Sequence, residues 1–311
     1  MLRSTMLDGC FSVKVAHVDS EIWAASDQSE DALLLRVPDT VVPGPRIDRI
    51  FNAFSGAGFG VSPGSLMTLR GVELGPVDGI DLGLRPANVL PTELGGTQVL
   101  FNRIPVHIIS VSANQVTFTA PYRLEGTSAA LQVKRGEQSS NELLVPVVEA
   151  NPGILAADFP SPDPESLPVA IARKQDGTLI TPSNPAPAGS TVWIYATGLG
   201  ATNIEVPSGA IATTEALRPA ADFREAAGLP STYGPFPTPL DPSGARAMIG
   251  FVNSVFAVPI VVRESGEPNG RTLIRITPAI QTRGASRRSY SPATILYVCK
   301  TTQTGSCQAQ Q

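Results

Sequence analysis

Two stretches of the chain repeat one pattern of hydrophobic and polar positions. They are Pro63-Gly-Ser-Leu-Met-Thr-Leu-Arg-Gly-Val-Glu-Leu-Gly-Pro76 and Ala188-Gly-Ser-Thr-Val-Trp-Ile-Tyr-Ala-Thr-Gly-Leu-Gly-Ala-Thr-Asn203. Aligned at Gly64 and Gly189, both continue with Ser, an apolar residue at every second position, and a second glycine turn at Gly75 or Gly200. Each stretch predicts one half-buried β-strand between two turns. We therefore expect two copies of one β unit in this chain.

Further alternating runs extend the strand prediction over both copies. In residues 114–121, Val116 and Phe118 share one face of the expected strand, and Thr117 and Thr119 share the other. With the runs at 97–111, 129–135 and 142–148, the first copy has about seven strands in about 100 residues, as immunoglobulin-like sandwiches do. In the second copy, the run at 245–262 is expected to match 97–111 and the run at 271–278 to match 114–121, and the run at 294–298 closes the second sheet. We predict an all-β fold with two tandem immunoglobulin-like β-sandwich domains.

The domain boundaries are expected where the pattern breaks. Residues 1–45 form a β-rich segment, which is either the end of a preceding repeat domain or a small meander packed on the first sandwich. The prolines of 41–46 form a stiff linker. The first sandwich is expected over 46–150 and the second over 151–300, with a tail at 301–311. A proline-rich insertion at about 205–242 interrupts the second sandwich, and we expect it to be exposed.

Composition agrees with this fold and excludes some partners. Charged residues make up 16%, and 28 Gly and 29 Pro supply many turns. The net charge of −4 gives no basic footprint for nucleic acid or an anionic membrane. The sequence contains no run of about 18 consecutive apolar residues, so it predicts no membrane insertion. Residues 1–10 lack the apolar core of a signal peptide. We therefore expect this chain to be the C-terminal part of a longer secreted or cell-surface protein.

Several motifs together resemble a known family. They are Asn52-Ala-Phe-Ser, Pro63-Gly-Ser-Leu-Met-Thr-Leu, Leu90-Pro-Thr-Glu-Leu-Gly-Gly-Thr-Gln-Val, Phe101-Asn, Asn114-Gln-Val-Thr-Phe-Thr-Ala-Pro-Tyr, Pro152-Gly-Ile-Leu and Ala196-Thr-Gly-Leu-Gly. In this order, over roughly 48–300, they resemble the Solibacter-type C-terminal domain family of secreted acidobacterial proteins. That family is similar in turn to the IPT/TIG immunoglobulin-like class. The resemblance implies an extracellular β-sandwich tail and no catalytic residues.

The residues themselves predict no catalytic or cofactor site. Ser62 lies in a Gly-x-Ser-x-Gly match, but the next residue is Pro63, which has no N–H for an oxyanion hole. His17 and His107 lie within expected strands. The glycine-rich runs at 56–60 and 198–200 are not followed by a helical pattern, so we interpret them as turns rather than phosphate-binding loops.

Metal binding and a disulfide are each left with two interpretations. The prolines around Asp158, Asp163 and Glu165 favour a solvated linker, so no metal site is predicted, and the alternative is a calcium site. Cys299 and Cys307 flank a short polar turn and form either a disulfide or two free thiols, whereas Cys10 has no nearby partner.

Trp193 and Tyr195 are the candidate ligand platform. They share one strand face, opposite Val192 and Ile194. If the aliphatic pair faces the core, the two rings form an exposed surface that stacks on a sugar or anchors a partner. The alternative is that the insertion covers them.

These observations predict a non-catalytic secreted or cell-surface module with a structural, anchoring or adhesion role. The expected partner is a protein or a glycan. One alternative is a carbohydrate-binding accessory module of a secreted enzyme, for which the Trp193–Tyr195 platform is the feature to test. Another is a subunit of an extracellular fibre assembled by pairing of edge strands.

Overall fold

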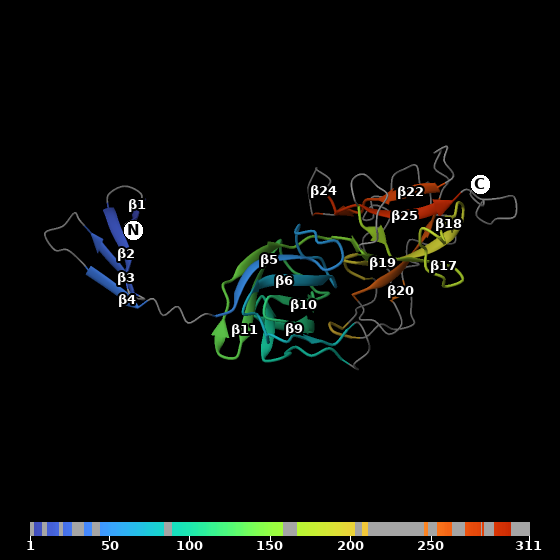
Figure 1. Cartoon of the computed structure of the whole chain (residues 1–311). Helices are drawn as coiled ribbons and strands as arrows, with labels where there is room; N and C mark the ends of the chain where they lie inside the picture. The colour runs from blue at the N-terminus through green and yellow to red at the C-terminus, as the bar shows by residue number, and fades with distance from the viewer. Residues whose placement is uncertain are drawn as a thin grey trace. The chain divides into compact units, whose positions relative to one another are not determined.

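The computed structural model describes residues 3–7, 11–18, 21–26, 34–38, 44–83, 89–157, 167–202, 207–210, 246–247, 254–262, 271–280, 282 and 289–299. These residues form 25 strands and no helix, so the predicted all-β fold is confirmed. No helix able to span a membrane occurs in this described part. The chain divides into two compact units, residues 1–44 and 45–311 (Figure 1).

The first unit contains an antiparallel meander in the order β1-β2-β3-β4. Its strands are β1 (Arg3–Leu7), β2 (Phe11–Val18), β3 (Glu21–Ser26) and β4 (Leu34–Pro38). Three of them match the expected runs. The sequence pattern does not predict β1, because Arg-Ser-Thr-Met-Leu contains too few apolar residues for a clear alternation.

The second unit begins with a nine-stranded sheet. Its central order is β12-β11-β8-β9-β10-β6-β5, with β13 beside β11 and β7 beside β9. Figure 1 labels β5, β6, β9, β10 and β11 of this sheet. The strands are β5 (Arg46–Asn52), β6 (Leu66–Val72), β7 (Ile80–Asp81), β8 (Thr97–Phe101), β9 (Ile104–Val111), β10 (Gln115–Thr119), β11 (Ser128–Arg135), β12 (Gln138–Ser139) and β13 (Leu143–Pro146). Strand β9 connects the two parts of this sheet, since its first residues pair with β8 and its later ones with β10.

The strands of this sheet direct one set of side chains into a hydrophobic core. The predicted alternation in β10 places Val116 and Phe118 inward, and both are fully buried. They belong to one cluster with Met67 and Leu69 of β6 and Leu131 of β11. Burial of apolar surface contributes roughly 25 cal/mol per Å², so this cluster is the main stabilising contact of the first half.

The run at 97–111 is two strands joined by a tight turn. Asn102 and Arg103 both have positive φ, 49° and 67°. A two-residue turn between antiparallel strands with positive φ at both positions favours the sequence Asn-Gly. An arginine at the second position of such a turn is unusual. The absence of glycine here is why alternation alone reads the segment as one continuous run.

The remaining strands build two five-stranded sheets and a two-stranded ribbon. One sheet has the order β14-β19-β21-β20 with β17 beside β19, and the other β15-β16-β25-β18 with β22 beside β25. The strands are β14 (Gly153–Ile154), β15 (Ala156–Ala157), β16 (Val169–Ala170), β17 (Ala172–Lys174), β18 (Ala186–Pro187), β19 (Thr191–Thr197), β20 (Arg246–Ala247), β21 (Phe256–Val261), β22 (Arg271–Ile276), β23 (Ala279–Ile280), β24 (Ser289–Tyr290) and β25 (Thr294–Cys299).

Both five-stranded sheets contribute to one core. Val192 and Ile194 of β19, Val258 of β21, and Leu296 and Val298 of β25 lie in a single buried cluster. All six residues of β25 are buried. The second half of the unit therefore consists of two sheets that share a hydrophobic interior.

The repeated pattern does give equivalent strands. Both β6 and β19 begin two residues after their glycine and are seven residues long. The wider match between the copies is only partial. Strand β10 lies between β6 and β9, but its expected counterpart β22 pairs with β25 in the other sheet, and β21 lies directly beside β19. The expected match of 271–278 to 114–121 is wrong at this level, because alternation specifies the face of a strand and not its neighbour.

Some expectations fall outside the described residues. Almost all of the 205–242 insertion does, apart from 207–210, as do the 301–311 tail and the loop with Asp158, Asp163 and Glu165. Residues 45–311 form one compact unit with a core in each half. Two separate immunoglobulin-like domains at 46–150 and 151–300 stay a prediction.

Two leucines on neighbouring strands test the assignment of the core. We expect Leu131→Ala, at a fully buried position in β11, to lower the free energy of unfolding by about 2–5 kcal/mol. Leu144→Ala in β13, where the side chain is 70% exposed, should change it by less than about 0.5 kcal/mol. Urea denaturation of both variants measures the difference, and equal losses would contradict the described core.

Candidate functional site

The two glycine-led strands meet where β6 begins and β19 ends. The backbone N–H of Leu66 donates to Thr197 Oγ1 at 2.9 Å, and the Thr197 hydroxyl donates to Ser254 O at 2.5 Å. Thr197 is fully buried. One hydroxyl thus accepts a hydrogen bond from the first half and donates one within the second.

Two buried asparagines extend this contact. Asn52 Nδ2 donates to Asn151 O at 2.9 Å, and Asn151 Nδ2 donates to Gly60 O at 2.9 Å. Asn52 Oδ1 accepts the backbone N–H groups of Phe54 and Ser55. Buried amide groups stabilise a fold only when they are hydrogen-bonded, and both side chains meet that requirement. We call Asn52, Ser62, Leu66, Asn151, Thr197 and Gly198 the junction.

Glycine lets the backbones approach this closely. A Cβ on Gly198, whose φ is 75°, would lie 2.2 Å from Asn151 O, and a Cβ on Gly153 would lie 2.2 Å from Asn52 Oδ1. A Cβ on Gly64 would lie 2.3 Å from the Tyr122 ring. These separations are too short for a side chain, so Gly64, Gly153 and Gly198 allow the close packing around the junction.

Tyr122 adds an apolar contact between the halves. Its ring packs beside Gly64 and against the core cluster of the second half. Burial raises the pKa of the Tyr122 phenol well above its ordinary value, so the side chain is neutral throughout the physiological range. The halves are therefore joined by both polar and apolar groups.

Ser62 belongs to the junction. It is fully buried, and its hydroxyl donates to Gly198 O at 3.2 Å. His107 lies elsewhere, with its ring against Gly209, and burial lowers the pKa of its imidazole. Within the described residues no hydrogen bond joins Ser62 to His107, and the side chain of His17 lies outside them. The Ser62 hydroxyl therefore forms a structural contact between the halves.

The expected aromatic platform is wrong for one of its two residues. Val192 and Ile194 face the core as predicted, but Tyr195 is only 9% exposed, and Trp193 is half-buried. Thr197 belongs to the junction and Ala196 to the core of the second half, so the end of β19 that carries Tyr195 is buried on both faces. Arg70, the equivalent residue of β6, is exposed, because the two strands contact different neighbours at this end.

Cys299 is disulfide-bonded, so the free-thiol interpretation is wrong for this residue. Its side chain is 4% exposed at the end of β25. The other two cysteines, Cys10 and Cys307, lie outside the described residues, so the pairing with Cys307 stays a prediction.

A shallow hollow of about 260 Å³ lies on the outer face of β8 and β11. Its lining residues are Leu100, Asn102, Arg103, Ala130, Gln132 and Glu142. Arg103 and Glu142 give it one charge of each sign. Among the described residues no group of three metal-ligating side chains occurs, here or elsewhere.

Sequence reasoning did not identify Asn52, Asn151 or Thr197 as functional residues. All three lie in or beside the motifs that carry the family resemblance. Nothing in those motifs indicates that they meet, because contacts across about 100 residues of chain depend on the fold and not on local spacing.

Two glycines with similar backbones test the junction. We expect Gly198→Ala to lower the free energy of unfolding by about 2–5 kcal/mol, because the new Cβ meets Asn151 O and φ is positive. Gly189→Ala, with φ at 82° but open space around the Cβ, should cost only about 1–2 kcal/mol. Equal costs in chemical denaturation would show that the close approach at Gly198 is not tight.

The disulfide can be assigned by mass spectrometry. We expect a non-reducing peptide map to contain Cys299 linked to Cys307, with Cys10 free. Because that bridge closes a short loop, Cys299→Ser together with Cys307→Ser should lower stability by about 2–3 kcal/mol. A cross-link from Cys299 to Cys10, or to a second chain, would overturn the assignment.

The sequence matches no family model and no curated protein. Among solved structures, it is similar to the gamma-CGTase of alkalophilic Bacillus clarkii, with 9% identity and a TM-score of 0.25 over 96% of this chain and 40% of that one. It is also similar to domains 4–9 of the surface layer protein SbsC, with 16% identity and a TM-score of 0.17 over 94% of this chain and 37% of that one. The chain thus spans about two fifths of the length of these structures, and such low TM-scores establish no shared fold.

Proposed function

We propose that this chain is a non-catalytic structural module of a secreted or cell-surface protein, in which residues 45–311 act as one rigid spacer or anchor. The observation that carries the proposal is the junction, where buried hydrogen bonds fix the two halves to each other. A module that transmits force or sets a distance needs such a fixed geometry. Interfaces between independent domains are usually more open to solvent and to relative motion.

The immunoglobulin-like fold and the family resemblance are part of this proposal. Two sheets around one core in the second half agree with a sandwich. Three of the motifs that resemble the Solibacter-type C-terminal domain family, at Asn52, Pro63–Ser65 and Ala196–Gly198, lie at or beside the junction. A role for those residues in fixing the halves together is a physical reason for such motifs to recur as a set.

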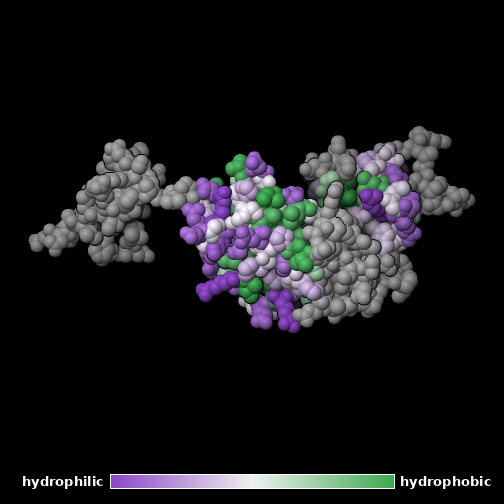
Figure 2. All heavy atoms as spheres, turned by 90° about the horizontal axis from the view of Figure 1, so that it is seen from below, coloured by the Kyte–Doolittle hydropathy of each residue, from purple (hydrophilic) through white to green (hydrophobic). Residues whose placement is uncertain are grey.

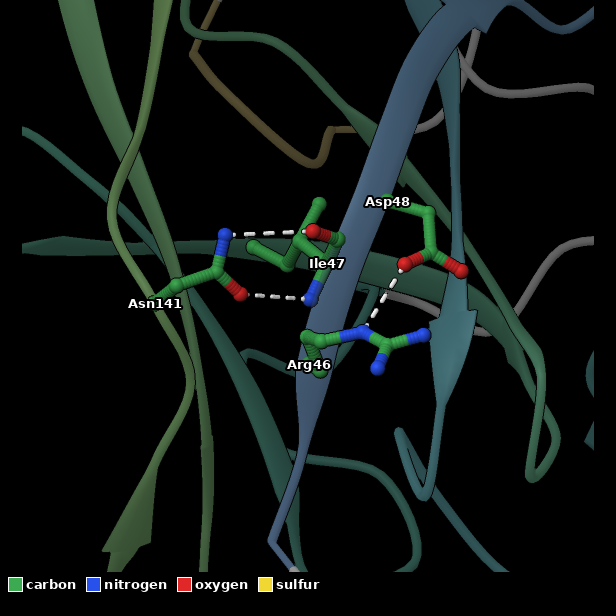
Figure 3. A network of polar contacts seen from close by, with 4 residues as sticks. All are labelled: Arg46, Ile47, Asp48 and Asn141. Atoms are coloured by element: carbon green, nitrogen blue, oxygen red, sulfur yellow. Dashed lines mark hydrogen bonds and ion pairs between the residues drawn. The ribbon is translucent and has the colours of Figure 1, made fainter. Parts of the chain in front are cut away.

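The fibre alternative receives less support from the strand edges. Strand β5 ends the central order of its sheet, but Asn141 occupies part of its free edge, as Figure 3 shows. Asn141 Oδ1 accepts Ile47 N–H at 2.8 Å, and Asn141 Nδ2 donates to Ile47 O at 3.1 Å. Those are the two bonds that an incoming antiparallel strand would form with Ile47. A side chain that occupies them protects the edge from pairing with another molecule.

The carbohydrate-binding alternative loses the feature on which it depended. It required Trp193 and Tyr195 to be exposed together, and Tyr195 is buried. The face drawn in Figure 2 shows hydrophilic side chains interspersed with smaller hydrophobic areas over its coloured part. We therefore retain the structural role as the proposal.

Hydrogen exchange tests whether the two halves act as one body. In the full chain we expect peptides from β11 and from β25 to exchange with the same opening free energy, because neither half opens without breaking the junction. Thr197→Val removes the shared hydroxyl, and it should lower that free energy by about 1–3 kcal/mol and separate the two values. Different opening free energies for β11 and β25 in the wild type would contradict the rigid-body proposal.

Protease treatment of intact producing cells tests the location of the protein. Full protection inside the cell would contradict a surface role.

A further inference from the structure

Two arginines of like charge lie directly opposite each other on the outer face of the first sheet. Arg49 of β5 pairs in register with Arg70 of β6, and both side chains are exposed. Like charges at directly opposite positions destabilise an antiparallel pair. This placement lowers the stability of the sheet unless another group compensates the repulsion.

Both guanidinium groups contact the ring of Phe51, which lies beside them on the same face of the sheet. The Cζ atoms of Arg49 and Arg70 lie 5.5 and 5.6 Å from the ring centroid, within the range of a cation–π contact. This attraction offsets part of the repulsion. The contact favours the rotamers that place both guanidinium groups against the ring, which reduces the entropy lost when a ligand binds.

Neither arginine has a carboxylate partner among the described residues, whereas their neighbour does. Arg46 on the same strand forms an ion pair with Asp48, with Nε 2.9 Å from Oδ1 (Figure 3). Two positive charges thus remain uncompensated on a chain whose formal net charge is −4. We call Arg49, Phe51 and Arg70 the arginine clamp.

Neutral polar groups continue this surface across the sheet. Gln115 of β10 lies opposite Arg70, and Thr117 lies opposite Thr68, whose hydroxyl is 3.2 Å from that of Thr117. Gln115 and Thr117 are half-buried. Thr68 is buried, so the groups that border the clamp at the surface are the Gln115 amide and the Thr117 hydroxyl, which form hydrogen bonds with sugar hydroxyls as readily as with water.

We propose that the arginine clamp binds an acidic polysaccharide through the carboxylates of its uronic acid residues. A guanidinium fork matches a carboxylate through two parallel hydrogen bonds, and an anion between the arginines removes their mutual repulsion. An acidic peptide fits this surface less well, because extended peptides bind sheets by adding a strand and Asn141 already occupies that edge at Ile47. This inference deepens the proposed anchoring role and rests on its extracellular location.

Titration of the full chain with polygalacturonate tests the proposal, with neutral dextran as the ligand control. Loss of a charge-assisted hydrogen bond weakens binding roughly tenfold, and we expect that loss from Arg49→Gln or Arg70→Gln. The Arg70→Lys variant, which keeps the charge but not the fork, should bind more weakly than wild type. Arg103→Gln removes one exposed arginine elsewhere in the same half, and its affinity should stay unchanged. Circular dichroism and the denaturation midpoint verify that each variant is folded.

Three outcomes would overturn the proposal. They are no binding of polygalacturonate by the wild type, an equal loss in Arg103→Gln and in the clamp variants, and tighter binding of polyglutamate than of polygalacturonate. The last outcome assigns the clamp to an acidic polypeptide. Hydrogen exchange at the junction does not depend on Arg49 or Arg70. If the clamp does not bind polygalacturonate, the proposed structural role is unaffected. If the rigid-body test fails, the binding result is likewise unaffected.

Discussion

The fold of residues 45–311 depends on a small set of buried hydrogen bonds between segments that are far apart in sequence. A buried amide or hydroxyl costs free energy unless every polar atom finds a partner. Asn52, Asn151 and Thr197 meet that demand only when the first half and the second half are in contact. Separation breaks the hydrogen bonds to Gly60 O and Leu66 N–H, and an opening too small to admit water leaves these groups without partners, so partial opening is unfavourable. The hydrophobic cores stabilise each half, and these polar groups specify how the halves fit.

The sequence predicts the elements of this fold better than their arrangement. Alternation at Val116 and Phe118, and at Val192 and Ile194, identifies the inward faces, because a half-buried strand must alternate. The neighbours of a strand leave no such local signal. The pairing of β22 with β25, the turn at Asn102 and Arg103, and the burial of Tyr195 all depend on contacts between distant segments.

The candidate sites, like the fold, could be predicted only in part from the local sequence pattern. The sequence points to Trp193 and Tyr195 as a platform from their spacing alone, but spacing does not say which end of a strand is covered. Arg49 and Arg70 are separated by 21 positions and share no motif, yet the register of β5 and β6 places them opposite each other. A like-charged pair is visible only once the strands are paired, and so no reading of local pattern could have found it.

Asn141 is exposed, yet its chemistry is as restricted as that of a core residue. The side chain must present a carbonyl oxygen to one backbone group of Ile47 and an NH₂ to the other. Aspartate has the same shape, but it would direct a carboxylate oxygen at the Ile47 carbonyl, and serine is too short to reach both groups. Among natural variants of this protein, position 141 should therefore tolerate fewer replacements than its solvent exposure suggests. Surface accessibility is a poor guide to evolutionary freedom wherever a side chain takes the place of a missing strand.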